Sequence, residues 1–292
     1  MFNLQWLALR QWLALRQWPA LRNSGLAALL GLLPLMAAHA ATPGAGAPAA
    51  AQPEPAEAEA QKILAASDAV RNPSHSFGLT NTMTEYRNGR QTDVSTLQIY
   101  AKADGNSGQY RNLIRFVAPA RDANKLMLKN GNDLWFYDPS SQASVRISPR
   151  QRLLGQAANG DVVTVNFARD YRARLVGEED IDDGDKLSHH CHKLALSAAA
   201  SDVTYDSLEI WIDASNSHPI KARFYAESGQ LLKTAYYRHY ERQLEVERPT
   251  ETVIIDGLDH QWVTIMRYSD YAWRDVPDSW QQRDYLARFR PE

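Results

Sequence analysis

Short apolar segments separated by turn residues fill the stretch from residue 113 to residue 171, and this pattern most constrains how the 292-residue chain can fold. The stretch includes RFVAP at 115–119, KLMLKNGNDLWFYDP at 125–139, RISPRQRLLG at 146–155 and NGDVVTVNFARDY at 159–171. Runs of this length, rich in aromatic and branched side chains, are typical of β-strands. They contain no recognisable catalytic motif, so the pattern favours a binding protein over a catalyst.

Turn signals divide the rest of the chain in the same way. Asn88 with Gly89, Asn130 with Gly131 and Asp138 with Pro139 predict tight reversals. The predicted strands are 77–84, 94–101, 110–117, 125–129, 134–137 and 144–147, followed by 172–178, 190–197, 205–213, 220–226, 231–240, 252–256 and 262–268. We therefore expect a mainly β protein with one large, curled antiparallel sheet of about eleven strands.

Helices are expected at three places. Residues 56–70 carry an apolar stripe that includes Ala60, Ile63 and Leu64, and Asn72 with Pro73 ends it. Shorter helices are predicted over 149–154 and around 165–170.

The first forty residues have the pattern of a secretory signal peptide. Three arginines and no acid precede an apolar run at 26–36 and a small-x-small site that ends at Ala40. The run is shorter than a membrane span, and the residue after the expected cleavage point is Ala41 rather than the cysteine that a lipid anchor requires. Residues 41–59, rich in Ala and Pro, are interpreted as a disordered linker.

Charge and cysteine content exclude some classes of protein. The whole chain has 32 basic and 34 acidic side chains, and the predicted leader removes three of the basic ones. Such a balance argues against a nucleic-acid partner, which would need a clustered basic face. Cys191 is the only cysteine, so the chain cannot form an internal disulfide.

Four motifs in order resemble the outer-membrane lipoprotein-sorting family, the relatives of LolA and LolB. They are RFVAP, NGNDLWFYDP at 130–139, RLLGQAANGDVVTVNFARDY at 152–171 and EIWIDASNSHPIKARFYAESGQLLK at 209–233. The resemblance implies a half-open β-barrel over residues 60–270, with helices over its concave mouth and acyl chains held in an apolar cavity. It also implies a periplasmic location and provides no catalytic residues or cofactor.

Bulky residues of the predicted strands are the candidates for lining that cavity. They are Phe77, Leu79, Leu113, Phe116, Leu126, Leu128, Trp135, Tyr137, Ile210, Phe224 and Tyr236. Core packing is the alternative role for each of them, because the sequence does not say which face of the sheet is open.

His189, His190, Cys191 and His192 form the one cluster whose side chains could bind zinc or copper. Adjacent residues of a strand point to opposite faces, so at most two of the four could share an ion. We therefore assign no metal site here and interpret Cys191 as a small buried apolar residue.

The sequence thus predicts a periplasmic, monomeric, non-enzymatic carrier that binds a lipid or an acylated lipoprotein. An inner-membrane transporter is a possible further partner. The alternative is an accessory or assembly module of an envelope transporter, docked through the aromatic residues of a C-terminal extension at 271–292, which includes Trp273, Trp280, Tyr285 and Phe289. A metal-dependent enzyme that uses His190 and His192 is a second alternative.

Overall fold

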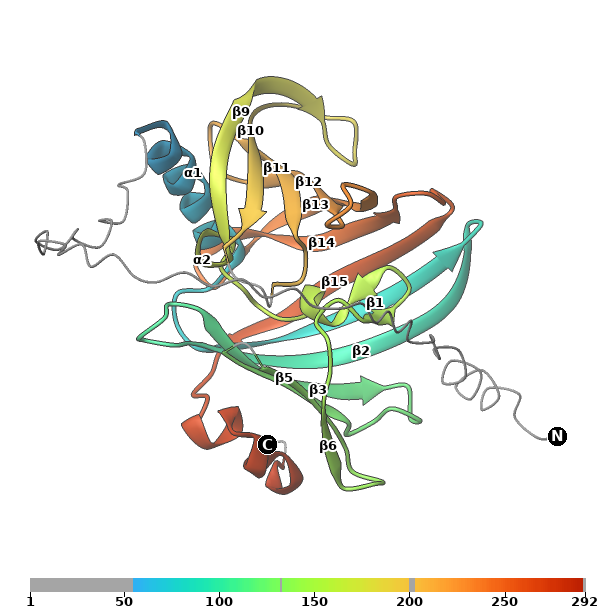
Figure 1. The fold of residues 1–292 in the computed structure, drawn as a ribbon. Coiled ribbons are helices and arrows are strands. Elements are labelled where there is room, and N and C mark those ends of the chain that lie inside the picture. The colour runs from blue at the N-terminus through green and yellow to red at the C-terminus, as the bar shows by residue number, and fades with distance from the viewer. Residues whose placement is uncertain (1–54, 132, 200–202, 291–292) are drawn as a thin grey trace, which may run out of the picture. The chain divides into compact units, whose positions relative to one another are not determined.

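An antiparallel sheet of thirteen strands dominates the computed structural model, which describes residues 55–131, 133–199 and 203–290. The predicted leader and most of the predicted linker lie outside these residues. The sheet curls without closing, which confirms the predicted fold class (Figure 1). Its thirteen strands equal the number of segments predicted individually and exceed the overall estimate of about eleven. None of the helices in the described part of the chain is both long and apolar enough to cross a membrane.

The sheet consists of two meanders. The first, which we call the N-terminal wing, contains β1 (Phe77–Arg87), β2 (Arg90–Ala103), β3 (Tyr110–Ala118), β4 (Leu126–Asn130), β5 (Asp133–Asp138) and β6 (Ala143–Arg146). The second, the C-terminal wing, contains β9 (Tyr171–Asp182), β10 (Ser188–Ala198), β11 (Ser207–Asp213), β12 (Pro219–Tyr225), β13 (Leu231–Gln243), β14 (Val246–Asp256) and β15 (Trp262–Trp273). The wings join through β1 and β15, so the first and last strands lie together at the centre of the sheet, and β6 and β9 form its edges.

Tight turns build the N-terminal wing as the sequence predicts. Asn88 and Gly89 both have positive φ, at 51° and 72°, and connect β1 to β2. Gly131, with φ at 57°, lies in the loop between β4 and β5. Asp138 accepts hydrogen bonds from the amide and hydroxyl of Ser140 and so fixes the reversal into β6.

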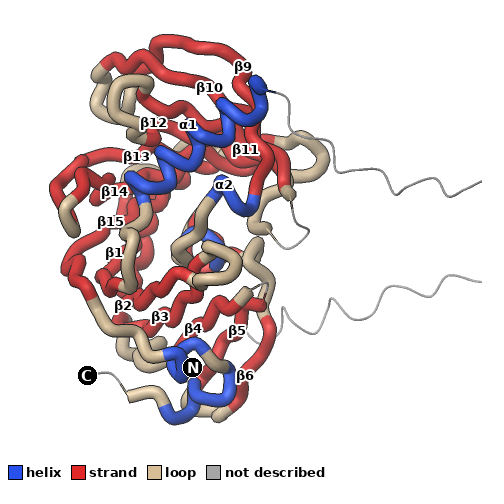
Figure 2. The backbone as a smooth tube through the Cα atoms, turned by 90° about the vertical axis from the view of Figure 1, so that its left-hand side faces the viewer, coloured by secondary structure: helices blue, strands red, loops and turns tan. Residues whose placement is uncertain are grey.

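The helix α1 (Pro55–Arg71) crosses the concave side of the C-terminal wing, where it contacts β9, β11 and β14 (Figure 2). Pro55 suits the first helical position, and Pro73 disfavours continuation of the helix beyond Asn72. The helix begins five residues before the predicted domain start at residue 60. Its buried large apolar side chains are only Leu64 and Val70, because the rest of its apolar stripe consists mainly of alanines.

The segment from residue 147 to residue 170 connects the two edges of the sheet across its concave side. It contains the short strands β7 (Arg152–Leu154) and β8 (Ala157–Ala158), the 3-10 helix η3 (Asn159–Asp161) and the helix α2 (Phe167–Asp170). The helix expected at 165–170 is confirmed, but the one expected at 149–154 is wrong. The chain instead turns at Gly155 between the paired strands β7 and β8. Gly155 has a left-handed φ of 53°, which a helix does not allow, and a Cβ there would lie 2.3 Å from Thr264 Oγ1.

The last described residues pack against the outside of the N-terminal wing (Figure 1). This C-terminal segment, residues 274–290, contains the 3-10 helices η4 (Asp278–Gln281) and η5 (Arg283–Arg288). The side chains of Trp280 and Phe289 are 9% and 6% exposed, whereas Trp273, at the end of β15, is 42% exposed. The expectation that these aromatics would be available to a membrane partner is therefore wrong for Trp280 and Phe289, because the sheet covers them.

Candidate ligand-binding site

Two adjoining cavities lie between the concave face of the sheet and the elements that cover it. Both are lined by Arg71 from α1, by Asp161, Val163 and Val165 from the connecting segment, and by Tyr237, Thr252 and Tyr268 from the sheet. The first cavity extends to Phe77, Leu79 and Ile99, and the second to Phe224, Ala235 and Met266. Each has a volume of about 100 Å³. This is well below the roughly 300–1,000 Å³ of sites that enclose a small ligand.

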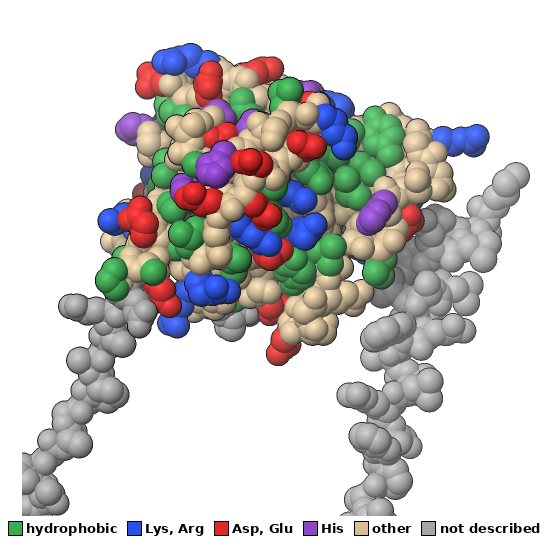
Figure 3. All heavy atoms as spheres, turned by 90° about the horizontal axis from the view of Figure 1, so that it is seen from above, with side chains coloured by type: hydrophobic (Ala, Val, Ile, Leu, Met, Phe, Trp, Pro, Cys, Tyr) green, Lys and Arg blue, Asp and Glu red, His purple; other side chains and the backbone are tan. Residues whose placement is uncertain are grey.

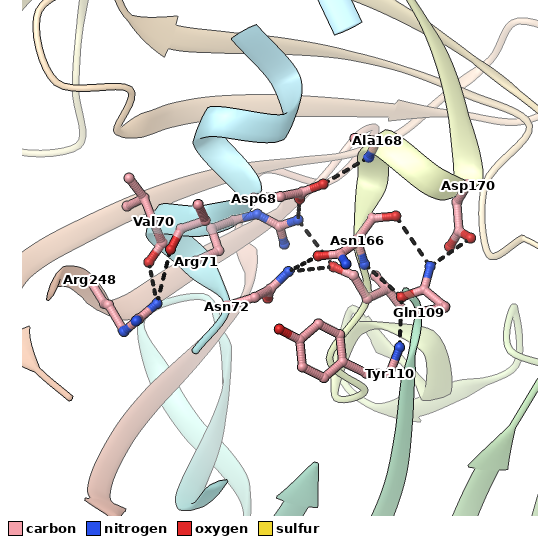
Figure 4. Close-up of polar contacts among 12 residues, drawn as sticks. Asp68, Val70, Arg71, Asn72, Gln109, Tyr110, Asn166, Ala168, Asp170 and Arg248 are labelled. Atoms are coloured by element: carbon pink, nitrogen blue, oxygen red, sulfur yellow. Dashed lines mark hydrogen bonds and ion pairs between the residues drawn. The ribbon is translucent and has the colours of Figure 1, made fainter. Parts of the chain in front are cut away.

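Polar contacts hold the cover over these cavities. We call them the latch: the contacts of Asp68, Arg71 and Asn72 at the end of α1 with residues 165–168 of the connecting segment (Figure 4). The Ala168 amide donates to Asp68 Oδ2 at 2.8 Å, and Asn72 Nδ2 donates to the Val165 carbonyl at 2.9 Å and to Asn166 Oδ1 at 2.8 Å. Arg71 donates to the Val165 carbonyl at 3.3 Å and forms an ion pair with Asp68.

The N-terminal wing binds the same segment from the other side. Gln109 accepts a hydrogen bond from the Asn166 amide at 2.7 Å and donates to Asp170 at 2.8 Å (Figure 4). Asn112 exchanges hydrogen bonds with the backbone of Thr164 at 2.8 and 3.0 Å. The connecting segment is thus attached to both wings through groups that water could also satisfy.

Arg248 anchors the end of α1. Its side chain is 2% exposed and donates to the carbonyls of Val70 at 2.7 Å and Ala69 at 3.3 Å. A cation at this position satisfies the last free carbonyls of the helix and interacts favourably with its dipole. Arg248 therefore anchors the C-terminal end of α1 to β14.

A buried ion pair lies at the bottom of the second cavity. Lys233 is 3% exposed, pairs with Asp161 and donates to the Gln156 carbonyl at 3.2 Å. Burial lowers the pKa of Lys233, and the Asp161 carboxylate opposes this effect. Asp161 also accepts from the Tyr205 hydroxyl at 2.9 Å and from the Ala158 amide at 2.6 Å. Both oxygens of this carboxylate thus accept hydrogen bonds from donors within the protein.

Arg71 differs, because part of its capacity is unused. Its guanidinium lies 4.0 Å from the centre of the Phe167 ring, and its Nε is buried without a hydrogen-bond partner among the described residues. Burial alone would lower the pKa of Arg71, but the Asp68 carboxylate and nearby tyrosines raise it overall. The side chain therefore stays charged inside the protein.

Tyr237 and Tyr268 line both cavities, and Tyr271 lines the first. Burial raises the pKa of Tyr268 to about 12 and also raises the pKa values of Tyr237 and Tyr271, so all three are neutral hydrogen-bond donors at physiological pH. The Tyr268 hydroxyl has only long contacts, 3.5 Å to Thr252 Oγ1 and 3.9 Å to Met266 Sδ.

The structure divides the eleven predicted lining residues between the two faces of the sheet. The residues on the concave side are Phe77, Leu79, Phe116, Ile210 and Phe224. The residues under the C-terminal segment, on the outer face, are Leu113, Leu126, Leu128, Trp135 and Tyr137. Tyr236 also lies on the outer face, where it contacts Lys221. Of the eleven, only Phe77, Leu79 and Phe224 line the two cavities.

Sequence reasoning missed the polar residues of the cavities. Lys233, Ala235 and Tyr237 alternate along β13, so a lysine shares a strand face with a small residue and an aromatic one. That placement was a usable signal for a buried cation. No comparable signal exists for Arg71, since arginine at the end of a helix is ordinary.

The histidine cluster lies on the hairpin of β9 and β10, away from the cavities. His190 Nδ1 is 2.8 Å from Asp180 and its Nε2 is 3.3 Å from Glu178, and these hydrogen bonds raise the pKa of His190. Figure 3 views the molecule from this end and shows histidines among acidic side chains. Cys191 is fully buried, as the sequence predicts, and burial raises the pKa of its thiol to about 12. Within the described residues, no three His, Cys, Asp or Glu side chains are arranged to hold a metal ion.

Comparison with solved structures defines the class of this fold. A LolA superfamily protein of Nitrosomonas europaea is 35% identical, with a TM-score of 0.69 over 77% of this chain and 98% of that one. A DUF1329 family protein of Desulfovibrio piger, 19% identical, has a TM-score of 0.67 over 79% of this chain and 99% of that one. An outer membrane lipoprotein-sorting protein domain of Vibrio parahaemolyticus, 18% identical, has a TM-score of 0.63 over 80% of this chain and 97% of that one.

The chain therefore has a LolA-like carrier fold, in which an open antiparallel sheet is covered by a few helices. It belongs to the LolA superfamily. A protein-family model described as "Uncharacterized protein" matches residues 108–288. No curated protein matches the sequence.

Proposed function

We propose that this protein is a periplasmic carrier that binds the acyl chains of a lipid or lipoprotein between the sheet and its cover. The observation that carries the proposal is a concave face that combines apolar side chains with a polar, hydrogen-bonded cover. Phe77, Leu79 and Phe224 supply apolar surface, and the cover is attached by the latch and by hydrogen bonds from Gln109 and Asn112. The proposed role requires no chemistry of the protein's own.

The size of the cavities makes opening a necessary part of this function. At about 100 Å³ each they are too small for an acyl chain, so the space between the sheet and its cover must widen to admit one. Ligand entry requires α1 and the connecting segment to separate. Five hydrogen bonds join α1 and Asn72 to residues 165–168, four in the latch and one from the Gln61 side chain to the Ala168 carbonyl, and at about 1 kcal/mol each they cost roughly 5 kcal/mol to break. Burial of about fifteen methylenes contributes roughly 12 kcal/mol, which exceeds that cost.

Lipid analysis tests the proposal directly. Protein purified from its native envelope should yield acyl chains on organic extraction and mass spectrometry, and lipid-free protein should take up a fluorescent hydrophobic probe. Protein with neither extractable acyl chains nor probe uptake would contradict the proposal.

The latch has its own test. Asn72→Ala removes two of the four hydrogen bonds of the latch, so probe entry should become roughly tenfold faster in stopped-flow fluorescence. Lys62→Gln, a change at an exposed position of the same helix, is the matched control and should leave the rate unchanged. Equal entry rates in all three proteins would show that the latch does not control access.

A further inference from the structure

We propose that the ligand of this carrier is an amphiphile with one anionic group, a carboxylate or a phosphate, and that Arg71 binds this group inside the protein. The inference rests on the proposed function and specifies the chemical class of its ligand. It follows from the supply of hydrogen-bond donors and acceptors around the two cavities.

Donors predominate among the side chains that are free to bind a ligand. Among the residues that the structure describes, Arg71 Nε is buried without a partner and the Tyr268 hydroxyl has only long contacts. The two carboxylates that line the cavities are already engaged, Asp161 with Lys233 and Tyr205, and Asp170 with Gln109. A site with unused donors and occupied acceptors is complementary to a ligand group that only accepts hydrogen bonds.

Charge favours an anion over a neutral acceptor. Lys233 and Asp161 neutralise each other, and Arg71 and Asp68 do the same. Arg248, buried nearby, contacts only backbone carbonyls in the described part of the chain, so the end of α1 carries a cation that has no carboxylate in contact there. An anion would offset this charge, and hydrogen bonds between a guanidinium and a carboxylate or phosphate are among the strongest in proteins.

The position of Arg71 couples anion binding to opening. Asp68 contacts Arg71 through one oxygen and accepts the Ala168 amide through the other (Figure 4). A ligand anion would compete with Asp68 for the guanidinium and so weaken the contact that holds α2. The tail of the ligand could then extend along Phe77, Leu79 and Ile99, or along Phe224 and Met266.

Competition binding with matched probes tests this inference. The probes are dansyl-labelled undecanoic acid, its methyl ester and the corresponding monoalkyl phosphate, titrated against the full-length mature protein. The acid or the phosphate should bind at least about tenfold more tightly than the ester. Equal affinities for all three would overturn the anion site but leave the carrier function intact, whereas failure of all three to bind would contradict the carrier function itself.

Two substitutions separate an anion site from a purely structural ion pair, because both break the Arg71–Asp68 contact. Arg71→Gln should abolish the preference for the anionic probes and leave ester affinity within about threefold. Asp68→Asn should strengthen anion binding several-fold, because it releases the guanidinium. A structural role alone would move acid and ester affinity together and in the same direction for both variants. Tyr268→Phe, which keeps the ring, should weaken only the anionic probes, and Lys62→Gln is again the control.

Discussion

The two wings of the sheet cover their outer faces in different ways. In the N-terminal wing, the apolar outer side chains of β2–β5 lie under Val276, Trp280, Leu286 and Phe289 of the C-terminal segment. In the C-terminal wing, Trp211 is buried by side chains of neighbouring strands. One cover comes from a distant part of the sequence, and the other is local.

The local cover is a layer of charged side chains. Lys193, Lys221 and Arg223 lie 4.8–5.4 Å from the Trp211 ring, and Glu209 pairs with Lys193 at 3.0 Å. Long cationic side chains bury apolar surface with their methylenes and keep their charges near water. The comparison shows that bulky side chains on both faces of a strand are not evidence of a ligand-binding site. Either a distant segment or local charged side chains can cover the outer face.

The largest effect should follow from damage to the distant cover. Trp280→Ala removes a large side chain that contacts Tyr100 and Phe289, so the free energy of unfolding should fall by about 3–5 kcal/mol in urea denaturation. Trp273→Ala, at an exposed tryptophan, is the matched control and should change stability by less than about 0.5 kcal/mol. Similar losses for both variants would mean that the C-terminal segment does not act as part of the core.

A smaller loss is expected in the local cover. Glu209→Gln removes a carboxylate that accepts from Tyr225 at 2.7 Å and pairs with Lys193, so stability should fall by about 1 kcal/mol at low salt. The loss should shrink in high salt, because screening weakens partly exposed ion pairs. The loss of stability in Trp280→Ala should not depend on salt in this way. An equal response of the two variants to salt would contradict the proposed difference between an apolar cover and a charged one.

Glu209 also makes the stability contributed by the local cover dependent on pH. Burial alone would raise the pKa of Glu209, but hydrogen bonds from Tyr225 and Lys193 outweigh it and lower the pKa overall. A lowered pKa adds stability that is present above the ordinary value near 4.5 and is lost as pH falls through the folded-state value. The difference between wild type and Glu209→Gln should therefore decrease as the pH falls below about 4.5.

The smallest effect should come from the histidine on the exposed hairpin. The pKa of His190 is raised above its ordinary value of 6.5 by Asp180 and Glu178, so its contribution is complete below that value and is lost as pH rises through the folded-state pKa. Wild type and His190→Gln should thus differ most in thermal unfolding near pH 6 and converge at alkaline pH. A difference that grows as pH rises would contradict this assignment.

Local patterns in the sequence were enough to predict the strands of the large sheet, but not the short strands β7 and β8. The pairs Asn88 with Gly89 and Asp138 with Pro139 place hairpins without knowledge of the rest of the chain. The segment around Gly155 was misassigned because its turn depends on the close approach of Thr264, which is distant in sequence.

The open face could not be predicted for a related reason. Leu113 and Ile114 are adjacent in the sequence and both fully buried. Leu113 lies under the C-terminal segment, and Ile114 packs in the core on the concave side. Alternation along a strand assigns residues to two faces but does not say which face is covered by which part of the protein. The residues that cover the outer face at Leu113 lie more than a hundred positions later in the sequence. Arg71 and Asp68 were missed since their role depends on contacts with the segment at 165–168.

The pairing of β1 with β15 also governs the order in which the protein can assemble. Each wing is a meander of neighbouring strands and can form from contacts close in sequence, whereas the seam between the wings must wait for almost the whole chain. The first cavity takes Phe77 from β1 and Tyr268 from β15, so its walls meet only at this seam. A chain that ends before β15 would lack this seam, so the first cavity would be completed only as one of the last steps of folding.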